Sequence, residues 1–400
     1  MASKRATAEQ FERYKELQTQ AWGGPEKVAT LMESSNDYRR AFAGGVYGRY
    51  EGELNHITPW VQRLVPDVAE RRLFEIGCGT GASTAAFATI CKGVTAFDID
   101  ARRAQLAQER LQIFGAMGST ATAANFVEIL NRLDAEDIVD GVLMFAVMEH
   151  MYPAERIEVL KRAWRKLPPG GIIVIGETPN RLCYFDPHTF LQPFANLLPP
   201  DLAKLWGENC VNDATRAAIK AAPTDNYMML RDSLVRMGQD GLSFHEFELA
   251  ISANVHECII SEEFDPEIND FNKPYRLEHD ILSKYLRERT PHVNPVFAMP
   301  LLYLVIRKAG EFQPGTLVTV TEEVSRDHLQ GVGLLQSGDA LTERRKIIET
   351  LYRRILRRRP REIEFNYWVD RCNGLSSIPK IIDEFFEVNE KINAQLPPAL

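Results

Sequence analysis

The sequence predicts a doubly wound α/β fold with a mostly parallel sheet, and three observations lead to this prediction. Short apolar runs that are typical of buried strands alternate with amphipathic helical segments over residues 51–180. One of these runs ends in a glycine-rich loop that leads into a helix. The next run ends in an acidic residue about 20 residues beyond the loop. A chain of 400 residues is long enough for one such domain with helical additions.

Composition and charge disfavour a general affinity for nucleic acids or membranes. The net charge is −8 at pH 7, whereas phosphate binding depends mainly on Lys and Arg. The six cysteines include no C-x-x-C pair, which is typical of reduced structural thiols in a cytoplasmic protein. The polar start of the chain lacks the apolar core of a secretory signal, and no apolar run approaches the ~20 residues that cross a bilayer. We therefore expect a cytoplasmic protein with no membrane insertion.

The chain is expected to begin with a helical segment at residues 1–50, in which Thr7 and Gln10 have the spacing of a capping box. Residues 51–310 follow as one α/β domain. Its expected strands are 73–76, 93–97, 141–146 and 171–176, and its expected helices are 81–90, 101–114 and 153–166. Because strands and helices alternate, we expect parallel pairing and helices on both faces of the sheet.

The remainder of the chain has weaker patterns. Residues 181–250 are polar and poorly periodic, and the apolar runs 255–260 and 301–306 are candidates for further strands. Glycine and proline residues make 311–340 an expected linker. Residues 341–395 are expected to form a small all-α C-terminal module.

A dense run of arginines lies between residues 353 and 361 of this module. Such a run is most often a solvated helix face, although it is able to dock an anionic glycan, a nucleic acid or an acidic partner. The module contains, in this order, Tyr352, Leu356, Arg358, Tyr367, Trp368, Gly374, Ser376, Phe385 and Glu390. This series resembles a small bacterial domain of unknown function that is found in surface-polysaccharide enzymes. The resemblance is compatible with a protein or glycan partner for the module.

The glycine-rich loop has the sequence Glu75-Ile76-Gly77-Cys78-Gly79-Thr80-Gly81. Glycines at alternate positions let the backbone turn sharply and let a ligand lie against it without interference from a Cβ atom. With Ala82 as the next small residue, the loop also matches a relaxed dinucleotide fingerprint, so a nicotinamide or flavin cofactor stays open at this point. Asp98, at the end of the next strand, is able to accept both hydroxyls of a cofactor's ribose. This contact does not by itself distinguish one class of ribose-containing cofactor from another. Asp100 is expected to cap the following helix.

The loop and three later motifs resemble class I S-adenosylmethionine-dependent methyltransferases over residues 70–180. The first motif of that family is acid-x-G-x-G-x-G, which here runs from Glu75 to Gly81. The later motifs are Phe97-Asp98-Ile99-Asp100, Phe145-Ala146-Val147-Met148-Glu149-His150 and Pro169-Gly170-Gly171. The resemblance implies a Rossmann-like sheet and S-adenosylmethionine as the cofactor.

The resemblance also implies which residues contact the cofactor. Asp98 is the ribose-binding acid, and Asn125 stands where the family usually has an acid that contacts the adenine amino group. In many relatives the residues before the first strand fold over the cofactor, which makes 1–50 a candidate lid. Arg49 is then a candidate partner of the methionine carboxylate. The alternative is that Arg49 is an exposed arginine beside aromatic residues that pack in the core. The expected cofactor-binding residues are Glu75, Gly77, Cys78, Gly79, Gly81, Asp98, Ile99, Asn125, Phe126, Phe145 and Arg49.

Residues 177–189, after the last strand of this series, are the expected acceptor side. They resemble the Thr-Pro-Asn-Arg and Asp-x-His-Thr stretches of bacterial methyltransferases linked with surface polysaccharides or small metabolites. We expect His188 to act as a general base that Asp186 orients, and a capped turn with a surface histidine is the alternative. His245, next to Glu246, is a second catalytic candidate, with a histidine at the edge of the core as the more common explanation.

These features predict methyl transfer to a small-molecule or saccharide acceptor, with a hydroxyl group as the acceptor. The sequence Thr178-Pro179-Asn180 is not the Asn-Pro-Pro-aromatic motif of amino-methylating nucleic-acid enzymes, which disfavours a nucleic-acid acceptor. No carboxylate cluster has metal-ligand spacing, so no obligatory metal is expected. Methylation of nitrogen or carbon on a metabolite is the alternative activity. The alternative that is not an enzyme is a scaffold protein that keeps the cofactor-binding fold without catalysis.

Overall fold

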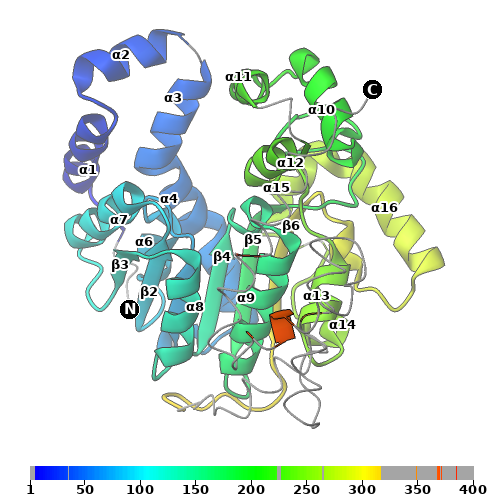
Figure 1. Cartoon of the computed structure of the whole chain (residues 1–400). Helices are drawn as coiled ribbons and strands as arrows, with labels where there is room; N and C mark the ends of the chain where they lie inside the picture. Colours follow the sequence, from blue (N-terminus) through cyan, green and yellow to red (C-terminus); the bar gives the residue numbers. More distant parts are fainter. Residues whose placement is uncertain are drawn as a thin grey trace. The chain divides into compact units, whose positions relative to one another are not determined.

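The computed structural model of the chain describes residues 5–34, 36–222, 227–263 and 265–316, together with 348, 367–369, 371 and 384 (Figure 1). The chain divides into two units, residues 1–319 and 320–400. Within the second unit the six described residues are helical. Most of the expected linker and of the expected C-terminal module, including the arginine run, lies outside the described residues.

The described part of the first unit contains a six-stranded sheet with the order β3-β2-β1-β4-β5-β6. Its strands are β1 (Arg72–Ile76), β2 (Gly93–Asp98), β3 (Thr120–Ala123), β4 (Gly141–Phe145), β5 (Ile172–Pro179) and β6 (Leu301–Arg307). All neighbours pair in parallel except β5 and β6, which are antiparallel. The doubly wound, mostly parallel sheet that the sequence predicts is therefore confirmed. Strand order reverses between β1 and β4, which is where open α/β sheets bind ligands.

Four helices connect the parallel strands and pack on the sheet. They are α6 (Ala82–Phe87), α7 (Ala101–Phe114), α8 (Phe126–Ala135) and α9 (Pro153–Lys166). Every residue of β4 is buried, as is almost all of β5, which is the pattern of central parallel strands covered on both faces. Helix α7 begins at the expected cap, because the Asp100 side chain accepts the backbone N–H groups of Arg102 and Arg103.

The N-terminal segment is helical, as predicted, and packs beside the glycine-rich loop. It contains α1 (Ala8–Ala21), α2 (Pro25–Ser34), α3 (Asn36–Ala43), α4 (Arg49–Gly52) and α5 (Thr58–Leu64), with two π-helical turns at Gly44–Gly48 and Glu53–Ile57. The capping box of Thr7 and Gln10 is present at the start of α1. Tyr14, which is fully buried, donates a hydrogen bond from its hydroxyl to the carbonyl of Thr80 at 3.2 Å. This contact joins the N-terminal segment to the loop.

Helices fill the connection between β5 and β6. They are α10 (Pro200–Trp206), α11 (Asp213–Ala221), α12 (Tyr227–Arg236), α13 (Phe244–Ala250), α14 (Val255–Cys258), α15 (Asn269–Asn272) and α16 (Arg276–Arg289). Helices α10 to α12 and the N-terminal helices α1 to α3 lie at the same end of the sheet in Figure 1. Among the described residues, no helix has the length and apolar character needed to cross a membrane.

The prediction of a strand at 255–260 was wrong. Val255–Cys258 is a short helix, and only Ile259 forms an isolated antiparallel bridge, with Ile306. A short apolar run with residues four apart, such as Val255 and Ile259, fits a helix turn as well as a strand. The other candidate run, at 301–306, does form a strand, β6, which closes the edge of the sheet beside β5.

Candidate active site

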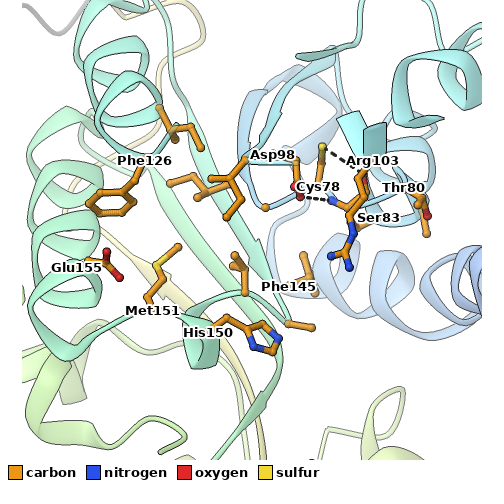
Figure 2. Close-up of a pocket in the computed structure, with 18 of the residues that line it drawn as sticks. Cys78, Thr80, Ser83, Asp98, Arg103, Phe126, Phe145, His150, Met151 and Glu155 are labelled. Atoms are coloured by element: carbon orange, nitrogen blue, oxygen red, sulfur yellow. Dashed lines mark hydrogen bonds between the residues drawn. The ribbon is translucent and has the colours of Figure 1, made fainter. Parts of the chain in front are cut away.

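A cavity of ≈ 700 Å³ lies at the carboxyl ends of β1, β2 and β4, where the strand order reverses (Figure 2). Among the residues that the sequence predicts to bind a cofactor, those that line it are Arg49, Gly77, Cys78, Gly79, Asp98, Ile99, Asn125, Phe126 and Phe145. Glu75 and Gly81 do not line it. In Figure 2, Phe126 and Met151 lie to one side of Asp98, and Cys78 and Ser83 lie to the other.

The three glycines of the loop differ in what they face. All have positive φ, 77° at Gly77, 53° at Gly79 and 77° at Gly81, a conformation that residues with a side chain rarely adopt. A Cβ atom at Gly79 would meet nothing within 4 Å, so the loop leaves open space there. A Cβ atom at Gly81 would lie 2.8 Å from the Cα and Cβ atoms of Ala107. Gly79 thus admits a ligand, whereas Gly81 permits close packing of the loop against α7.

Asp98 holds the loop from the end of β2. Its side chain is 6 % exposed, and its two oxygens accept the backbone N–H groups of Gly79 at 2.8 Å and of Asp100 at 2.9 Å. A carboxylate has about four lone-pair positions, so each oxygen keeps the capacity for a further donor. Because Asp98 also lines the cavity, these oxygens suit a pair of hydroxyl groups.

Glu75 has a structural role instead of the expected contact with a cofactor. Its carboxylate is fully buried and accepts hydrogen bonds from the hydroxyls of Ser83 and of Thr84, the latter at 2.5 Å. Burial raises the pKa of Glu75, and the two hydroxyls oppose that rise. The side chain therefore ties the end of β1 to the first turn of α6 and shapes the loop from behind.

Apolar side chains and a helix cap form the far side of the cavity. Asn125 caps α8, since its side chain accepts the N–H of Glu128 at 3.0 Å while the Glu128 carboxylate accepts the N–H of Asn125 at 2.9 Å. Phe126 and Ile99 line the cavity, and Ile99 is 73 % exposed. An apolar side chain so exposed beside a cavity is suited to cover a flat ring.

Arg49, on α4, reaches the cavity and forms an ion pair with Glu177 at the end of β5. Glu177, near the end of β5, and Ala146, directly after β4, have positive φ values of 54° and 46°. Such strain in residues with side chains is concentrated at functional sites. Arg49 thus lines the cavity, with a carboxylate of this chain as its partner.

Glu149, His150 and His188 come together beside the cavity, and of the three only His150 lines it. Glu149 and His150 follow β4, and His188 follows β5. The Oε1 atom of Glu149 lies 3.8 Å from Nε2 of His150 and 3.7 Å from Nε2 of His188, and the two imidazole rings are 5.4 Å apart. Sequence reasoning missed Glu149, and its only signal was a Glu-His pair directly after a buried strand.

Asp186 does not contact the His188 imidazole, contrary to the sequence-based expectation. Its buried carboxylate accepts three backbone N–H groups, those of His188 at 2.9 Å, Thr189 at 3.0 Å and Phe190 at 2.8 Å. The imidazole Nδ1 instead contacts the Thr189 hydroxyl at 3.1 Å. Asp186 therefore fixes the turn that carries His188, as in the capped-turn alternative.

Comparison with known proteins identifies the region around this cavity. Residues 74–175 match the family described as a methyltransferase domain. Members of that family use S-adenosylmethionine as their cofactor. The open backbone at Gly79, the Asp98 carboxylate and the apolar Ile99 and Phe126 side chains fit that cofactor.

Solved structures of methyltransferases are similar to parts of the chain. An amino pentose methyltransferase of calicheamicin biosynthesis from Micromonospora echinaspora is 24% identical, with 35% of this chain and 56% of that chain covered and a TM-score of 0.27. A phosphoethanolamine N-methyltransferase from Haemonchus contortus is 19% identical, with 43% of this chain and 33% of that chain covered and a TM-score of 0.29. The chain spans 56% of the first of these proteins and a third of the second. No curated protein matches the chain.

His245 does not line the cavity. It is an exposed residue of α13, and its ring stacks on Phe244 with centroids 3.9 Å apart. Its neighbour Glu246 caps α13 and binds the buried guanidinium of Arg156 at 2.9 Å. The pair therefore serves packing, as the alternative interpretation of this motif expects.

Burial controls the charge of the cluster formed by Glu149, His150 and His188. Glu149 is 0 % exposed, and burial raises the pKa of its carboxyl group to about 8. Burial lowers the pKa of His188 to about 4, with smaller contributions from His150 and Arg49. Burial also lowers the pKa of His150. The environment thus favours neutral imidazoles, which are able to accept a proton or bind a cation.

Proposed function

We propose that the full chain transfers a methyl group from S-adenosylmethionine to a hydroxyl group of a small molecule or saccharide. S-adenosylmethionine supplies an electrophilic methyl group on a sulfonium centre. Asp98 would bind the ribose hydroxyls, Ile99 and Phe126 would cover the adenine, and Arg49 would attract the methionine carboxylate. Transfer of this kind requires mainly alignment of the reacting groups, for which orientation is able to contribute up to about 7–11 kcal/mol.

The choice of a hydroxyl acceptor rests on one observation, which is the lone pair on Nε2 of His188. The Thr189 hydroxyl donates to the carbonyl of Met237 at 3.1 Å, so it accepts a hydrogen bond from Nδ1 of His188. With the proton on Nδ1, the Nε2 atom carries a lone pair. Since the pKa of His188 is lowered to about 4, this lone pair is available near neutral pH. His188 would take the proton of the acceptor hydroxyl as its oxygen bonds to the methyl carbon and the carbon–sulfur bond breaks.

The first experiment separates cofactor binding from chemistry. Calorimetric titration of S-adenosylhomocysteine into the full chain should show binding, and labelled S-adenosylmethionine should then methylate hydroxyl-bearing acceptors from a panel that begins with saccharides. His188→Ala should lower kcat by roughly 10²–10⁴-fold, the usual contribution of a general base, with unchanged affinity for S-adenosylhomocysteine. His245→Ala is the matched control and should retain full activity.

Two outcomes would contradict this proposal. Near-full activity of His188→Ala would favour a nitrogen or carbon acceptor on a metabolite, because such acceptors need no strong base. Cofactor binding without turnover on any acceptor would favour a non-catalytic scaffold protein.

A further inference from the structure

Three groups that carry lone pairs, Glu149, His150 and His188, converge beside the cavity, and among the described residues no cationic side chain donates a hydrogen bond to the Glu149 carboxylate. The potential ligand atoms of Glu149, His150 and His188 all lie within 4.8 Å of one another. Glu149 is fully buried, and among the described residues neither of its carboxylate oxygens has a hydrogen-bond partner. Burying a charged carboxylate without hydrogen-bond donors costs free energy. The Glu149 carboxylate would therefore be stabilised by a bound cation or by a proton.

The surrounding hydrogen bonds fix the tautomers of both histidines. Nδ1 of His150 lies 2.8 Å from the backbone carbonyl of Arg236, and because a carbonyl only accepts, Nδ1 carries the proton. Nδ1 of His188 donates in the same way to the Thr189 hydroxyl. Both Nε2 atoms are thus lone-pair acceptors, and both lie within 4 Å of the same Glu149 oxygen. Metal-binding histidines are typically held by such an outer contact at the other ring nitrogen.

The geometry of the cluster is close to that of a bound ion. Ligand atoms at ~2.0–2.1 Å from a tetrahedral ion lie about 3.3–3.4 Å apart. The observed separations from Glu149 Oε1 are 3.7 and 3.8 Å, and the ligand atoms of all three residues lie within 4.8 Å of one another, so the side chains would have to move inward to hold an ion. Gly238 packs against the cluster from behind, where an added Cβ atom would lie 2.8 Å from Cε1 of His188 and 3.1 Å from Cγ of Glu149.

We propose that Glu149, His150 and His188 bind a divalent transition-metal ion, for which Zn²⁺ is a suitable probe. Two imidazole nitrogens and one carboxylate oxygen favour such an ion over Mg²⁺, which prefers oxygen ligands and water. His150 lines the cavity, so the open coordination positions of the ion would be accessible to an acceptor. The sequence-based expectation of no metal rested on the spacing of ligands along the chain. In this set, residues 149–150 and residue 188 are far apart in the sequence and come together only in the folded protein.

The role of the ion rests on the proposed function. A metal-bound hydroxyl has a lowered pKa, so the acceptor would lose its proton to solvent and attack the methyl carbon as an alkoxide. His188 would then act as a ligand instead of a base. The reaction would still break one carbon–sulfur bond, form one oxygen–carbon bond and release one proton.

The test is a titration of the full-length, chelator-treated protein with ZnCl₂ and, separately, with MgCl₂. We expect one equivalent of Zn²⁺ to bind with micromolar or tighter Kd and Mg²⁺ not to compete. Glu149→Gln and His188→Gln should weaken Zn²⁺ binding by more than the roughly 10–100-fold that is lost with an outer contact. His245→Gln, at an exposed histidine outside the cavity, is the matched control and should leave Zn²⁺ affinity unchanged. Absorption in the visible range after titration with Co²⁺ should report the same site.

The proposal would be overturned if the wild-type protein did not bind Zn²⁺. It would also be overturned if both ligand variants bound Zn²⁺ with unchanged affinity. Two variants at different ligands keep the test valid if one fails to fold, which thermal melting would reveal. A parallel titration with S-adenosylhomocysteine separates the two hypotheses. Binding of S-adenosylhomocysteine without Zn²⁺ binding would reject the metal site alone, whereas Zn²⁺ binding without S-adenosylhomocysteine binding would reject the proposed function alone.

Discussion

The carboxylate of Asp98 accepts the backbone N–H of Gly79 at 2.8 Å. This hydrogen bond joins the end of β2 to the loop that follows β1, so the acid that would bind ribose also sets the position of the loop beside it. Its second oxygen accepts the N–H of Asp100, the cap of α7. One side chain therefore links three parts of the cofactor site, and its loss should affect binding more than folding.

Replacing Asp98 by alanine should weaken binding of S-adenosylhomocysteine by about 1–3 kcal/mol, because the ribose hydroxyls and the Gly79 N–H would lose their acceptor. Isothermal titration calorimetry measures this directly. Asp98→Asn keeps one carbonyl oxygen and should give an intermediate loss. Equal affinity in Asp98→Ala and wild type would contradict the assignment of Asp98 to the cofactor.

Alanine substitutions at two glycines of the loop should differ in how much they affect cofactor affinity and stability. Gly79→Ala meets open space, so it should cost about 1–2 kcal/mol of stability for its left-handed backbone and strongly reduce cofactor affinity. Gly81→Ala adds a clash with Ala107, for which overpacking typically costs ~1–3 kcal/mol more. Urea unfolding measures the loss of stability and calorimetry the loss of affinity, and unchanged cofactor affinity in Gly79→Ala would show that the open space is not a ligand site.

Much of the fold was predictable because its signals are local. Runs such as 141–146 are apolar throughout, as buried parallel strands require. The strand Thr120–Ala123 escaped prediction, since it consists only of threonine and alanine and most of its residues are exposed. The short run beginning at Val255 was assigned to the wrong element because a few apolar residues fit both periodicities.

The two ends of the candidate site were predictable to different degrees. Asp98 and Gly79 are separated by one strand–helix unit, so a motif in the sequence places them together. Glu149 and His188 meet only because the segment after β5 folds back over the turn after β4. That fold-back depends on the Asp186 turn and on the helices between β5 and β6, and the sequence shows no periodic signal for either.

Loss of the Asp186 carboxylate should impair chemistry more than cofactor binding. Asp186→Ala removes the acceptor of three backbone N–H groups, which should displace His188 and lower kcat by up to roughly 10²-fold, the cost of a small misplacement of a reacting group. Affinity for S-adenosylhomocysteine should not change. Asp186→Asn retains one acceptor oxygen and should have an intermediate kcat. Wild-type kcat in Asp186→Ala would show that the turn does not position His188.

Arg156 of α9 holds the turn that carries Glu149. Its buried guanidinium donates to the backbone carbonyls of Met148 at 2.8 Å, Met151 at 2.9 Å and Glu149 at 3.2 Å. It also donates to the carboxylate of Glu246 on α13 at 2.9 Å. One side chain therefore connects the turn after β4 with the inserted helices.

Arg156→Met should destabilise the fold by about 3–5 kcal/mol, because it leaves the buried charge of Glu246 without its cationic partner, with only the contacts to Ser243, and removes a donor from several buried carbonyls. The free energy of unfolding in urea measures this loss. The double variant Arg156→Met/Glu246→Gln should recover part of it, since the buried charge is then removed. Arg162→Met is a matched control on the same helix, where the partly exposed pairs with Glu158 and Asp134 should contribute only about 0–1 kcal/mol. Similar losses in Arg156→Met and Arg162→Met would mean that the Arg156 contacts do not hold the turn in place.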